Sequence, residues 1–277
     1  MLLKLPAIQK AIAAEKLIVK KLVEENKIQG IISDNRFGLR NAAIPSVFIT
    51  HQLNVLSGGT SYFSSKIHQK IIKKFDVCWV PDVDNLVLNL SGKLGHLRRD
   101  PFRIKHIGIL SRMQKREVPK TIDILVLLSG PEPQRTIFET KMKQELINSG
   151  KNVFMVRGFV ENRKVWQDFE NIKTVNYMNA NDLEDTINTS EIIISRPGYT
   201  TLMDLTVLEK KAFFIPTPGQ YEQKYLAIRL KNLGIAPSCK QKDFKIEKLN
   251  EVESYSGLKT LPESKIDFNA LFSLFQV

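Results

Sequence analysis

The stretch from Glu191 to Leu230, EIIISRPGYTTLMDLTVLEKKAFFIPTPGQYEQKYLAIRL, decides the fold of this chain. Its first residues, 191–195, are a short β-branched run typical of a strand that is buried on both faces. Pro197 and Gly198 end this run, because proline lacks the N–H that a strand ladder needs and glycine tolerates a tight turn. The sequence therefore predicts a buried strand followed by a sharp turn.

A helix, a second strand and a second helix follow the turn. Residues 200–209 carry leucines three residues apart, which predicts a helix with one apolar stripe. The apolar run at 212–216 predicts the next strand, and the amphipathic residues 222–233 predict a helix that ends at Gly234. The order strand, helix, strand, helix indicates an α/β fold with a parallel sheet.

In such a sheet, the two turns lie at the carboxyl ends of their strands, where open α/β sheets bind ligands. The two helices that follow these turns then begin at one crevice. Each helix N-terminus carries unpaired N–H groups and about half a positive charge, which suits a diphosphate. Asp204 lies one turn into the first helix, and its carboxylate is able to accept two hydrogen bonds from a sugar diol.

The same residues resemble a known family. Ser195-Arg196-Pro197-Gly198, Thr200-Thr201-Leu202 with Asp204, and Glu222-Gln223 before Ala227 are similar to the C-terminal domain of the family 28 glycosyltransferases. This family has the GT-B fold, includes the peptidoglycan N-acetylglucosaminyltransferases and is related to the UDP-glucuronosyltransferases. The resemblance implies two Rossmann-like domains with parallel sheets, of which the N-terminal one is incomplete here.

The resemblance also implies which residues of the second domain contact each part of the UDP-sugar. The residue that matches Asp204 holds the ribose of UDP, and the pair that matches Glu222 and Gln223 contacts the donor sugar. The predicted nucleotide site consists of Ser129, Gly130, Arg157, Met178, Ser195, Arg196, Gly198, Thr200, Thr201 and Asp204. Gly198 alone also fits a plain turn glycine, and Asp204 alone a solvated helix residue, so the ordered set carries the prediction.

The composition fits a globular enzyme. The chain has 277 residues, 43% of them hydrophobic, and a net charge of +12. Its lysines are spread along the sequence without a nucleic-acid recognition motif, so we expect no nucleic-acid partner. The positive charge weakly favours peripheral contact with an anionic membrane. Cys78 and Cys239 fit neither a disulfide framework nor a zinc site, and we expect a cytoplasmic protein, at most at the inner face of the membrane.

The first part of the chain predicts the acceptor side. The amphipathic helix at 6–27, whose apolar side we expect to include Ile8, Ile12, Leu17, Ile18, Leu22 and Val23, fits packing against a sheet better than lying on a membrane. A strand then ends at Asp34, and the next one runs into His51, Gln52 and Asn54. By resemblance this region faces the acceptor, with Gln52 and Asn54 as contacts, and it leaves His51 and Asp34 as the visible candidates for a catalytic base.

The domain boundaries follow from composition. We expect a partial N-terminal domain at residues 1–112, and a charged, proline-containing linker at 113–120. A C-terminal nucleotide-sugar-binding domain is expected at 121–262. The helix at 263–277 should pack back on the N-terminal domain. The N-terminal domain expected here is incomplete, and one interpretation is that a separate subunit supplies the missing part.

The leading hypothesis is a metal-independent hexosyltransferase that moves a sugar from a UDP-sugar to a lipid or glycan acceptor, with no cofactor. The sequence lacks the Asp-x-Asp motif of the metal-dependent class of glycosyltransferases. One alternative is a non-catalytic module that binds a nucleotide sugar or docks on a partner. Another is a nucleotide-sugar epimerase with the same fold, which would release UDP without an acceptor.

Overall fold

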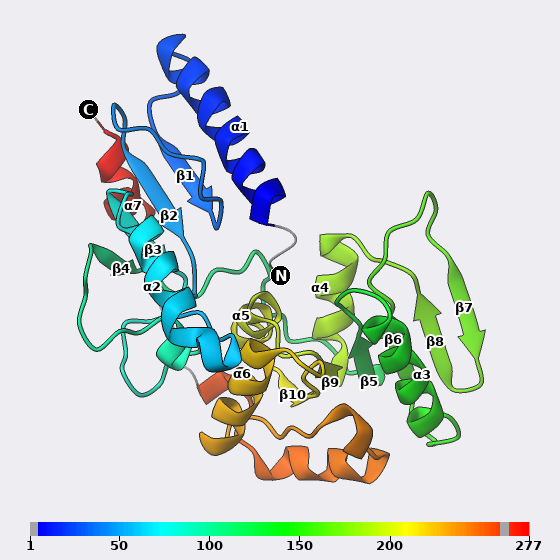
Figure 1. Ribbon diagram of the computed structural model, residues 1–277. Coiled ribbons are helices and arrows are strands. Elements are labelled where there is room, and N and C mark those ends of the chain that lie inside the picture. The colour runs from blue at the N-terminus through cyan, green and yellow to red at the C-terminus, as the bar shows by residue number, and fades with distance from the viewer. Residues whose placement is uncertain (1–4, 261–265, 277) are drawn as a thin grey trace. The chain divides into compact units, whose positions relative to one another are not determined.

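The computed structural model describes residues 5–260 and 266–276, which belong to two compact units (Figure 1). The first unit comprises Met1–Leu110 and Glu263–Val277, and the second comprises Ser111–Pro262. In the part of the chain that is described, no helix combines the length and the apolar character needed to cross a membrane.

The first unit is built on a parallel sheet in the order β1-β2-β3-β4. Its strands are β1 (Ile31–Asp34), β2 (Ser46–Ile49), β3 (Val77–Val80) and β4 (Ile104–His106). Because side chains alternate along a strand, Phe48 and Cys78 face Ile72 of α2 (Ser61–Ile72), whereas Val47 and Trp79 lie in the cluster that contains Leu271. Leu271 belongs to α7 (Phe268–Phe272), after which η7 (Ser273–Phe275) ends the described chain.

Helix α1 (Leu5–Glu24) presents a different side to its own unit than its sequence pattern predicts. Val19 is buried, while Leu17 and Ile18, which we expected on the packed side, are exposed. The side chain of Glu15 explains part of this orientation, because it accepts hydrogen bonds from the Arg36 guanidinium and from the backbone N–H of Gly38. The loop after β1 thereby fixes the rotation of the helix.

The second unit contains a six-stranded sheet in the order β10-β9-β5-β6-β8-β7. Five of its strands are parallel, and β7 runs antiparallel at the edge. The strands are β5 (Ile122–Leu127), β6 (Val153–Val156), β7 (Trp166–Phe169), β8 (Ile172–Val175), β9 (Ser190–Ser195) and β10 (Lys211–Phe214).

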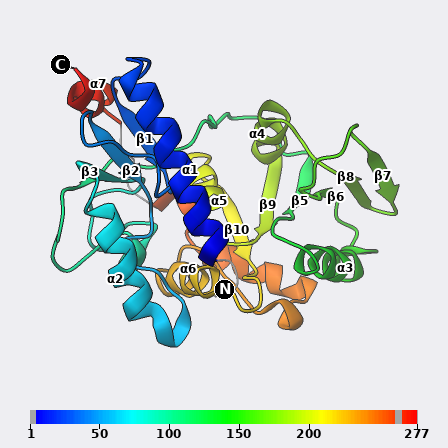
Figure 2. The same cartoon turned by 45° about the horizontal axis from the view of Figure 1, so that its top comes forward.

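Helices cover both faces of this second sheet. They are α3 (Gln134–Leu146), α4 (Ala180–Asn188), α5 (Tyr199–Val207) and α6 (Tyr221–Asn232). Figure 2 shows α3 and α4 on opposite faces. On the α3 face, Phe138 and Met142 pack with Ile124 and Ile194 of the strands and with Phe244 of the chain after α6. The strands and helices of this unit therefore alternate as predicted for residues 191–230.

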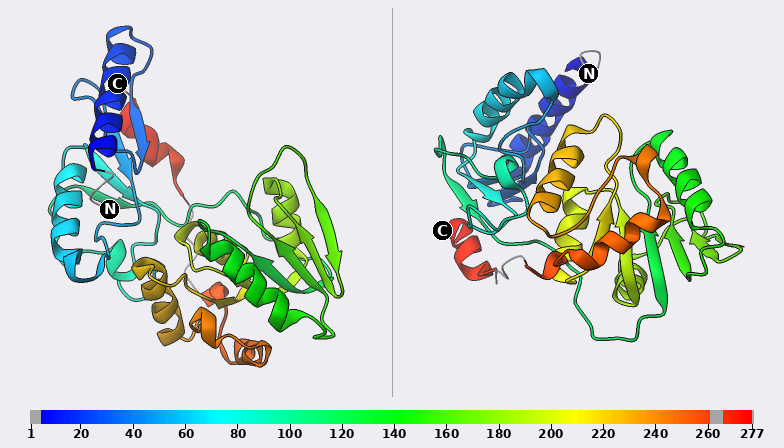
Figure 3. Two further views of the ribbon diagram at one scale, coloured as in Figure 1. Left: turned by 45° about the vertical axis from the view of Figure 1, so that its right-hand side comes forward. Right: turned by 90° about the horizontal axis from the view of Figure 1, so that it is seen from below.

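One strand of the second unit was not predicted. Strand β7 is exposed at all four residues and has no apolar run, so no hydrophobic pattern marks it. After α6 the chain forms two 3-10 helices, η4 (Gln241–Asp243) and the nine-residue η5 (Ile246–Ser254) (Figure 3). A further one, η6, spans Leu258–Thr260.

Candidate functional site

The carboxyl ends of β9 and β10 place two helix starts at one edge of the sheet. Ser195 pairs with Phe214 in the parallel register, so the two strands end side by side. Helix α5 begins at Tyr199 after the first strand, and α6 begins at Tyr221 after the second. This is the arrangement that the stretch 191–230 predicts.

Neither helix start is closed by a side-chain cap within the described residues. The first turn of α5 holds no acidic residue, whereas the first turn of α6 contains Glu222. A negative side chain in the first turn already interacts with the helix dipole and repels a second anion. Of the two helices, α5 therefore offers the better electrostatic site for a diphosphate.

Gly198 keeps the start of α5 open, although its backbone angles do not require glycine. Its φ of −75° is accessible to any residue. A Cβ atom at this position would meet only Thr201 Oγ1, at 4.0 Å. The missing side chain thus leaves room in front of the helix, beside the exposed Thr200 and the half-buried Thr201.

The carboxyl group of Asp204 is oriented by the segment that precedes β5. Ser111 Oγ donates a 2.6 Å hydrogen bond to Asp204 Oδ1. Burial raises the pKa of the Asp204 carboxyl above its ordinary value, while this hydrogen bond and the charge of Arg112 act in the opposite direction. The side chain is half-buried. Asp204 is therefore a held and partly desolvated carboxyl group, unlike the freely solvated helix residue that was the alternative.

The side chain of Arg196, a residue of the predicted nucleotide site, points into the interior. It is 1% exposed, and its guanidinium lies 3.8 Å from the ring centroid of Phe138. Its Nη1 donates to the carbonyl of Ile215 at 2.8 Å, and its Nη2 donates to Gln241 Oε1 at 2.5 Å. Burial lowers the pKa of Arg196 to about 10. Arg196 connects the end of β9 to the loop after β10 and to η4.

Ser195 is also buried, so its hydroxyl does not reach the surface either. Its Oγ has no hydrogen-bond partner within the described chain. Ser195 therefore contributes to the turn through its backbone.

Four further predicted nucleotide residues follow the strands β5, β6 and β8. Ser129 and Gly130 are exposed directly after β5, and the φ of +98° at Gly130 is one that favours glycine. Arg157 is engaged by Glu139, whose Oε1 lies 2.9 Å from Arg157 Nε. Met178 follows β8, and its Sδ accepts a hydrogen bond from the Thr186 hydroxyl at 3.4 Å. Only the Ser129-Gly130 turn is fully exposed among these.

The predicted donor-sugar pair lies in the first turn of α6. Gln223 Oε1 accepts a 2.8 Å hydrogen bond from the backbone N–H of Thr217. The side chain of Gln223 thus fixes the loop 216–220 that leads into its own helix. Glu222 is half-buried beside it.

In the first unit, the predicted acceptor and base residues gather at the ends of β1 and β2. Asp34 pairs with Ile49 in the parallel register and is exposed. His51 and Gln52 follow β2 and are half-buried. The amide of Asn54 is engaged within the loop, because Nδ2 donates to the Lys93 carbonyl at 2.7 Å and Oδ1 accepts from Gln69 Nε2 at 3.1 Å. The acceptor contact at Asn54 stays a prediction.

His68 is a residue at this edge that the sequence did not single out. Its ring lies edge-on between Phe37 and Phe48, and it hydrogen bonds to the backbone of Gln52. Burial lowers the pKa of His68. This residue supports the loop that carries His51 and Gln52, and nothing in its helical sequence context marks that role.

Comparison with known proteins finds matches to the second unit. Residues 132–260 match the family model described as "Glycosyltransferase family 28 C-terminal domain". A UDP-N-acetylglucosamine--N-acetylmuramyl-(pentapeptide) pyrophosphoryl-undecaprenol N-acetylglucosamine transferase of Buchnera aphidicola subsp. Schizaphis graminum is 27% identical over 210 residues, which cover 72% of this chain and 54% of the relative. The chain thus spans about half the length of that relative.

Solved structures share the fold. MurG of Acinetobacter baumannii matches with a TM-score of 0.58 and 14% identity, over 98% of this chain and 78% of that one. CalG4, the calicheamicin glycosyltransferase, matches with a TM-score of 0.60 and 12% identity, over 90% of this chain and 72% of that one.

Proposed function

Because residues 132–260 match the model of the glycosyltransferase family 28 C-terminal domain, we propose that this chain is a hexosyltransferase that uses a UDP-sugar donor. Its two α/β units with parallel sheets are of the GT-B type, the first of them with four strands in the described residues. The observation that carries the proposal is the pair of helix starts, α5 and α6, at the adjacent ends of β9 and β10.

The donor nucleotide is assigned to the second unit. Asp204 would accept hydrogen bonds from the ribose hydroxyls, and backbone N–H groups between Gly198 and Thr201 would bind the diphosphate. The Ser129-Gly130 turn would lie against the same phosphates, and the backbone at Met178 would meet the uracil. Ser195 would contribute through its backbone, and Arg196 and Arg157 would support the site through their contacts with the Ile215 carbonyl and with Glu139.

Glu222 and Gln223 are assigned to the donor sugar. Both lie in the first turn of α6, where Gln223 is already positioned by the Thr217 N–H. A half-buried carboxylate and a positioned amide suit hydroxyl groups, since they offer acceptors and a donor in a defined geometry. Which hexose they select is open to experiment.

The transfer is a displacement at the anomeric carbon. An acceptor hydroxyl oxygen forms the new bond to that carbon, the bond to the β-phosphate oxygen breaks, and UDP leaves with the bonding electrons. The dipole of α5 stabilises the charge that develops on the leaving diphosphate, which supports a reaction without a metal or other cofactor. Asp34 or His51 takes the acceptor's proton as the general base, and Gln52 binds the acceptor.

The acceptor is proposed to be a lipid or a glycan, at the inner face of the cytoplasmic membrane. Helix α2 supports membrane contact, because Tyr62, Phe63 and Ile67 are 67%, 70% and 65% exposed. Lys66 and Lys70 lie among them on the same helix and suit anionic headgroups. In the described residues β1 pairs only with β2, so its other edge is available to a strand of a partner subunit.

The experiment that tests the proposal is a calorimetric titration of the full chain with UDP, UDP-N-acetylglucosamine and dTDP. Selective binding of the uridine nucleotides is the expected result. Release of UDP that depends on an added lipid-linked or glycan acceptor then establishes transfer. Absence of UDP binding by a folded chain would refute the proposal, and binding without turnover would favour a non-catalytic module.

A further inference from the structure

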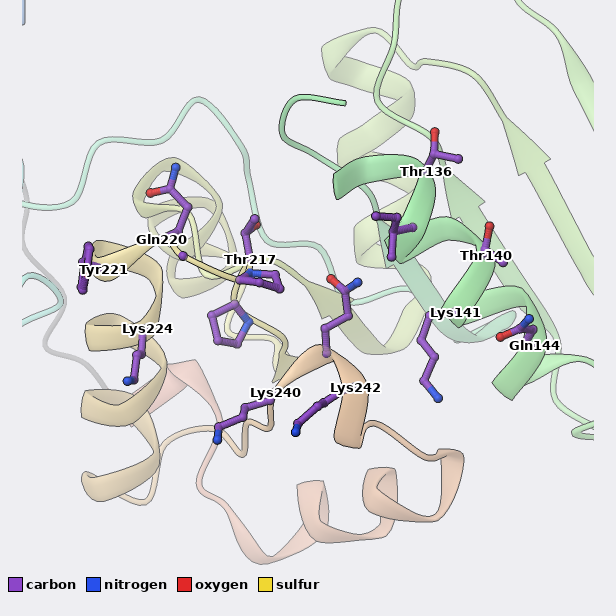
Figure 4. Close-up of a pocket in the computed structure, with 15 residues that line it drawn as sticks. Thr136, Thr140, Lys141, Gln144, Thr217, Gln220, Tyr221, Lys224, Lys240 and Lys242 are labelled. Atoms are coloured by element: carbon purple, nitrogen blue, oxygen red, sulfur yellow. The ribbon is translucent and has the colours of Figure 1, made fainter. Parts of the chain in front are cut away.

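A cavity of about 780 Å³ opens in the second unit between α3, α6, the loop 216–220 and the chain at η4 (Figure 4). Its volume lies within the range of roughly 300–1,000 Å³ that is usual for small-molecule sites. The functional assignments made above do not include it. All of its walls belong to one unit, so its shape is a property of that unit alone.

The charged residues that line the cavity are all positive. Of the fifteen described residues that line it, four are lysines and none is acidic. Lys141 is neutralised by Glu145, whose Oε1 lies 2.7 Å away. Lys224, Lys240 and Lys242 have no carboxylate within 4.0 Å in the described parts of the chain. In Figure 4 these three side chains extend towards the same side of the pocket, although they come from α6 and from the chain at η4.

Three ammonium groups that gather without a counter-charge repel one another, and an anion bound between them removes that repulsion. A phosphate is the anion whose several oxygens can accept hydrogen bonds from three ammonium groups at once. The lysines therefore define the polar end of a ligand.

The rest of the wall is apolar. Ile137 and Tyr221 are exposed large apolar side chains, and Pro216 and Pro218 also belong to the lining. Such surface is stabilised when an apolar group covers it and displaces water. A free phosphate would leave this wall in water, so the cavity fits an anion that carries an apolar chain.

From this combination we propose that the cavity binds an alkyl phosphate. The phosphate lies between Lys224, Lys240 and Lys242, and the hydrocarbon chain lies along Ile137, Pro216 and Pro218. The site is distinct from the nucleotide site at the start of α5, and it goes beyond the proposed transferase function.

The test is a calorimetric titration of the full chain with decyl phosphate below its micelle concentration. Inorganic phosphate and 1-decanol serve as separate probes of the two ends of the ligand. We expect decyl phosphate to bind at least about tenfold more tightly than either probe, since each probe engages only half of the site. Equal affinity for inorganic phosphate would overturn the proposal in favour of a plain anion site, and equal affinity for decanol would overturn it in favour of an apolar pocket.

Two variants locate the binding. Lys240→Gln combined with Lys242→Gln should weaken decyl phosphate about tenfold or more and leave UDP binding unchanged. Lys151→Gln combined with Lys173→Gln removes two exposed lysines of the same unit that do not line the cavity. This control should change neither the affinity for decyl phosphate nor the affinity for UDP. Equal loss in both variants, or displacement of decyl phosphate by UDP, would place the ligand elsewhere and contradict the proposal. Loss of UDP binding alone would bear on the transferase function and leave the cavity site standing.

Discussion

Ser111 and Asp204 are 93 residues apart in the chain, and the hydroxyl of the first donates a 2.6 Å hydrogen bond to the carboxyl group of the second. The bond joins the segment before β5 to the middle of α5. It holds the Asp204 side chain in one orientation before any ligand arrives, so less rotamer entropy is lost on binding. The carboxyl group that we assign to the ribose is therefore preorganised.

Replacing Asp204 by alanine should weaken UDP binding by about 1.5–3 kcal/mol, the usual contribution of hydrogen bonds to a charged group. Titration calorimetry of the variant measures this loss. Asp168→Ala, on the exposed edge strand β7, is the matched control and should bind UDP like the unchanged chain. Unchanged affinity in Asp204→Ala would remove this residue from the site.

The pH dependence of stability should report the environment of Asp204. Burial raises its folded-state pKa above the ordinary value of 3.8, so the folded chain holds this proton more tightly than the unfolded chain does. The stability that the group contributes is complete below that ordinary value and is lost as the pH rises through the raised pKa. Asp204→Asn should therefore gain stability relative to the unchanged chain between about pH 4 and pH 7. Urea unfolding at a series of pH values measures the difference, and a gain that does not vary with pH would contradict the assignment.

Arg196→Met should destabilise the second unit by about 2–4 kcal/mol, because the carbonyl of Ile215 and the amide of Gln241 lose their buried donor. Methionine retains much of the packing against Phe138. Arg163→Met replaces an exposed arginine and should change the free energy of unfolding by no more than about 0.5 kcal/mol. Denaturant unfolding compares the two. A loss of UDP affinity at normal stability would instead restore Arg196 to the nucleotide site.

Gly158→Ala should be much more costly than Gly130→Ala, although both glycines have positive φ angles, +73° and +98°. A Cβ atom at Gly158 would lie 2.2 Å from the carbonyl oxygen of Leu128, whereas nothing lies within 4 Å at Gly130. Gly130→Ala should lower the free energy of unfolding by about 1 kcal/mol, because only the backbone conformation is strained. Gly158→Ala should lower it by at least about 3 kcal/mol, because the clash is added. Thermal unfolding distinguishes them, and similar losses in both variants would show that the backbone relieves the contact.

The fold of the second unit was predictable because its strands are buried on both faces and its helices carry one apolar stripe. Those patterns are local, and they placed β9, α5, β10 and α6 correctly. Strand β7 was missed because an exposed edge strand has no such pattern. The buried side of α1 was predicted only in part, since Ile12, Leu22 and Val23 are half-buried but Ile8, Leu17 and Ile18 are exposed. The hydrogen bonds of Glu15 to the loop after β1, which depend on the tertiary structure, are not visible in the helix's own pattern.

The places of the predicted site residues in the fold were predictable, but the direction of individual side chains was not. The carboxyl ends of parallel strands fix where Gly198, Asp204 and Glu222 lie. Whether Arg196 points outward or inward depends on Phe138 and Gln241, which lie far from it in the sequence. The engagement of Asn54 by the Lys93 carbonyl is equally non-local.

The hydrogen bond from the Thr217 N–H to Gln223 has a thermodynamic consequence. Thr217 belongs to the wall of the lysine-lined cavity, and Gln223 belongs to the proposed donor-sugar pair. One loop thus belongs to both proposed sites. A cavity ligand that favoured one conformation of this loop would change the affinity for the donor sugar, and linkage would require the sugar to change the affinity for that ligand by the same factor.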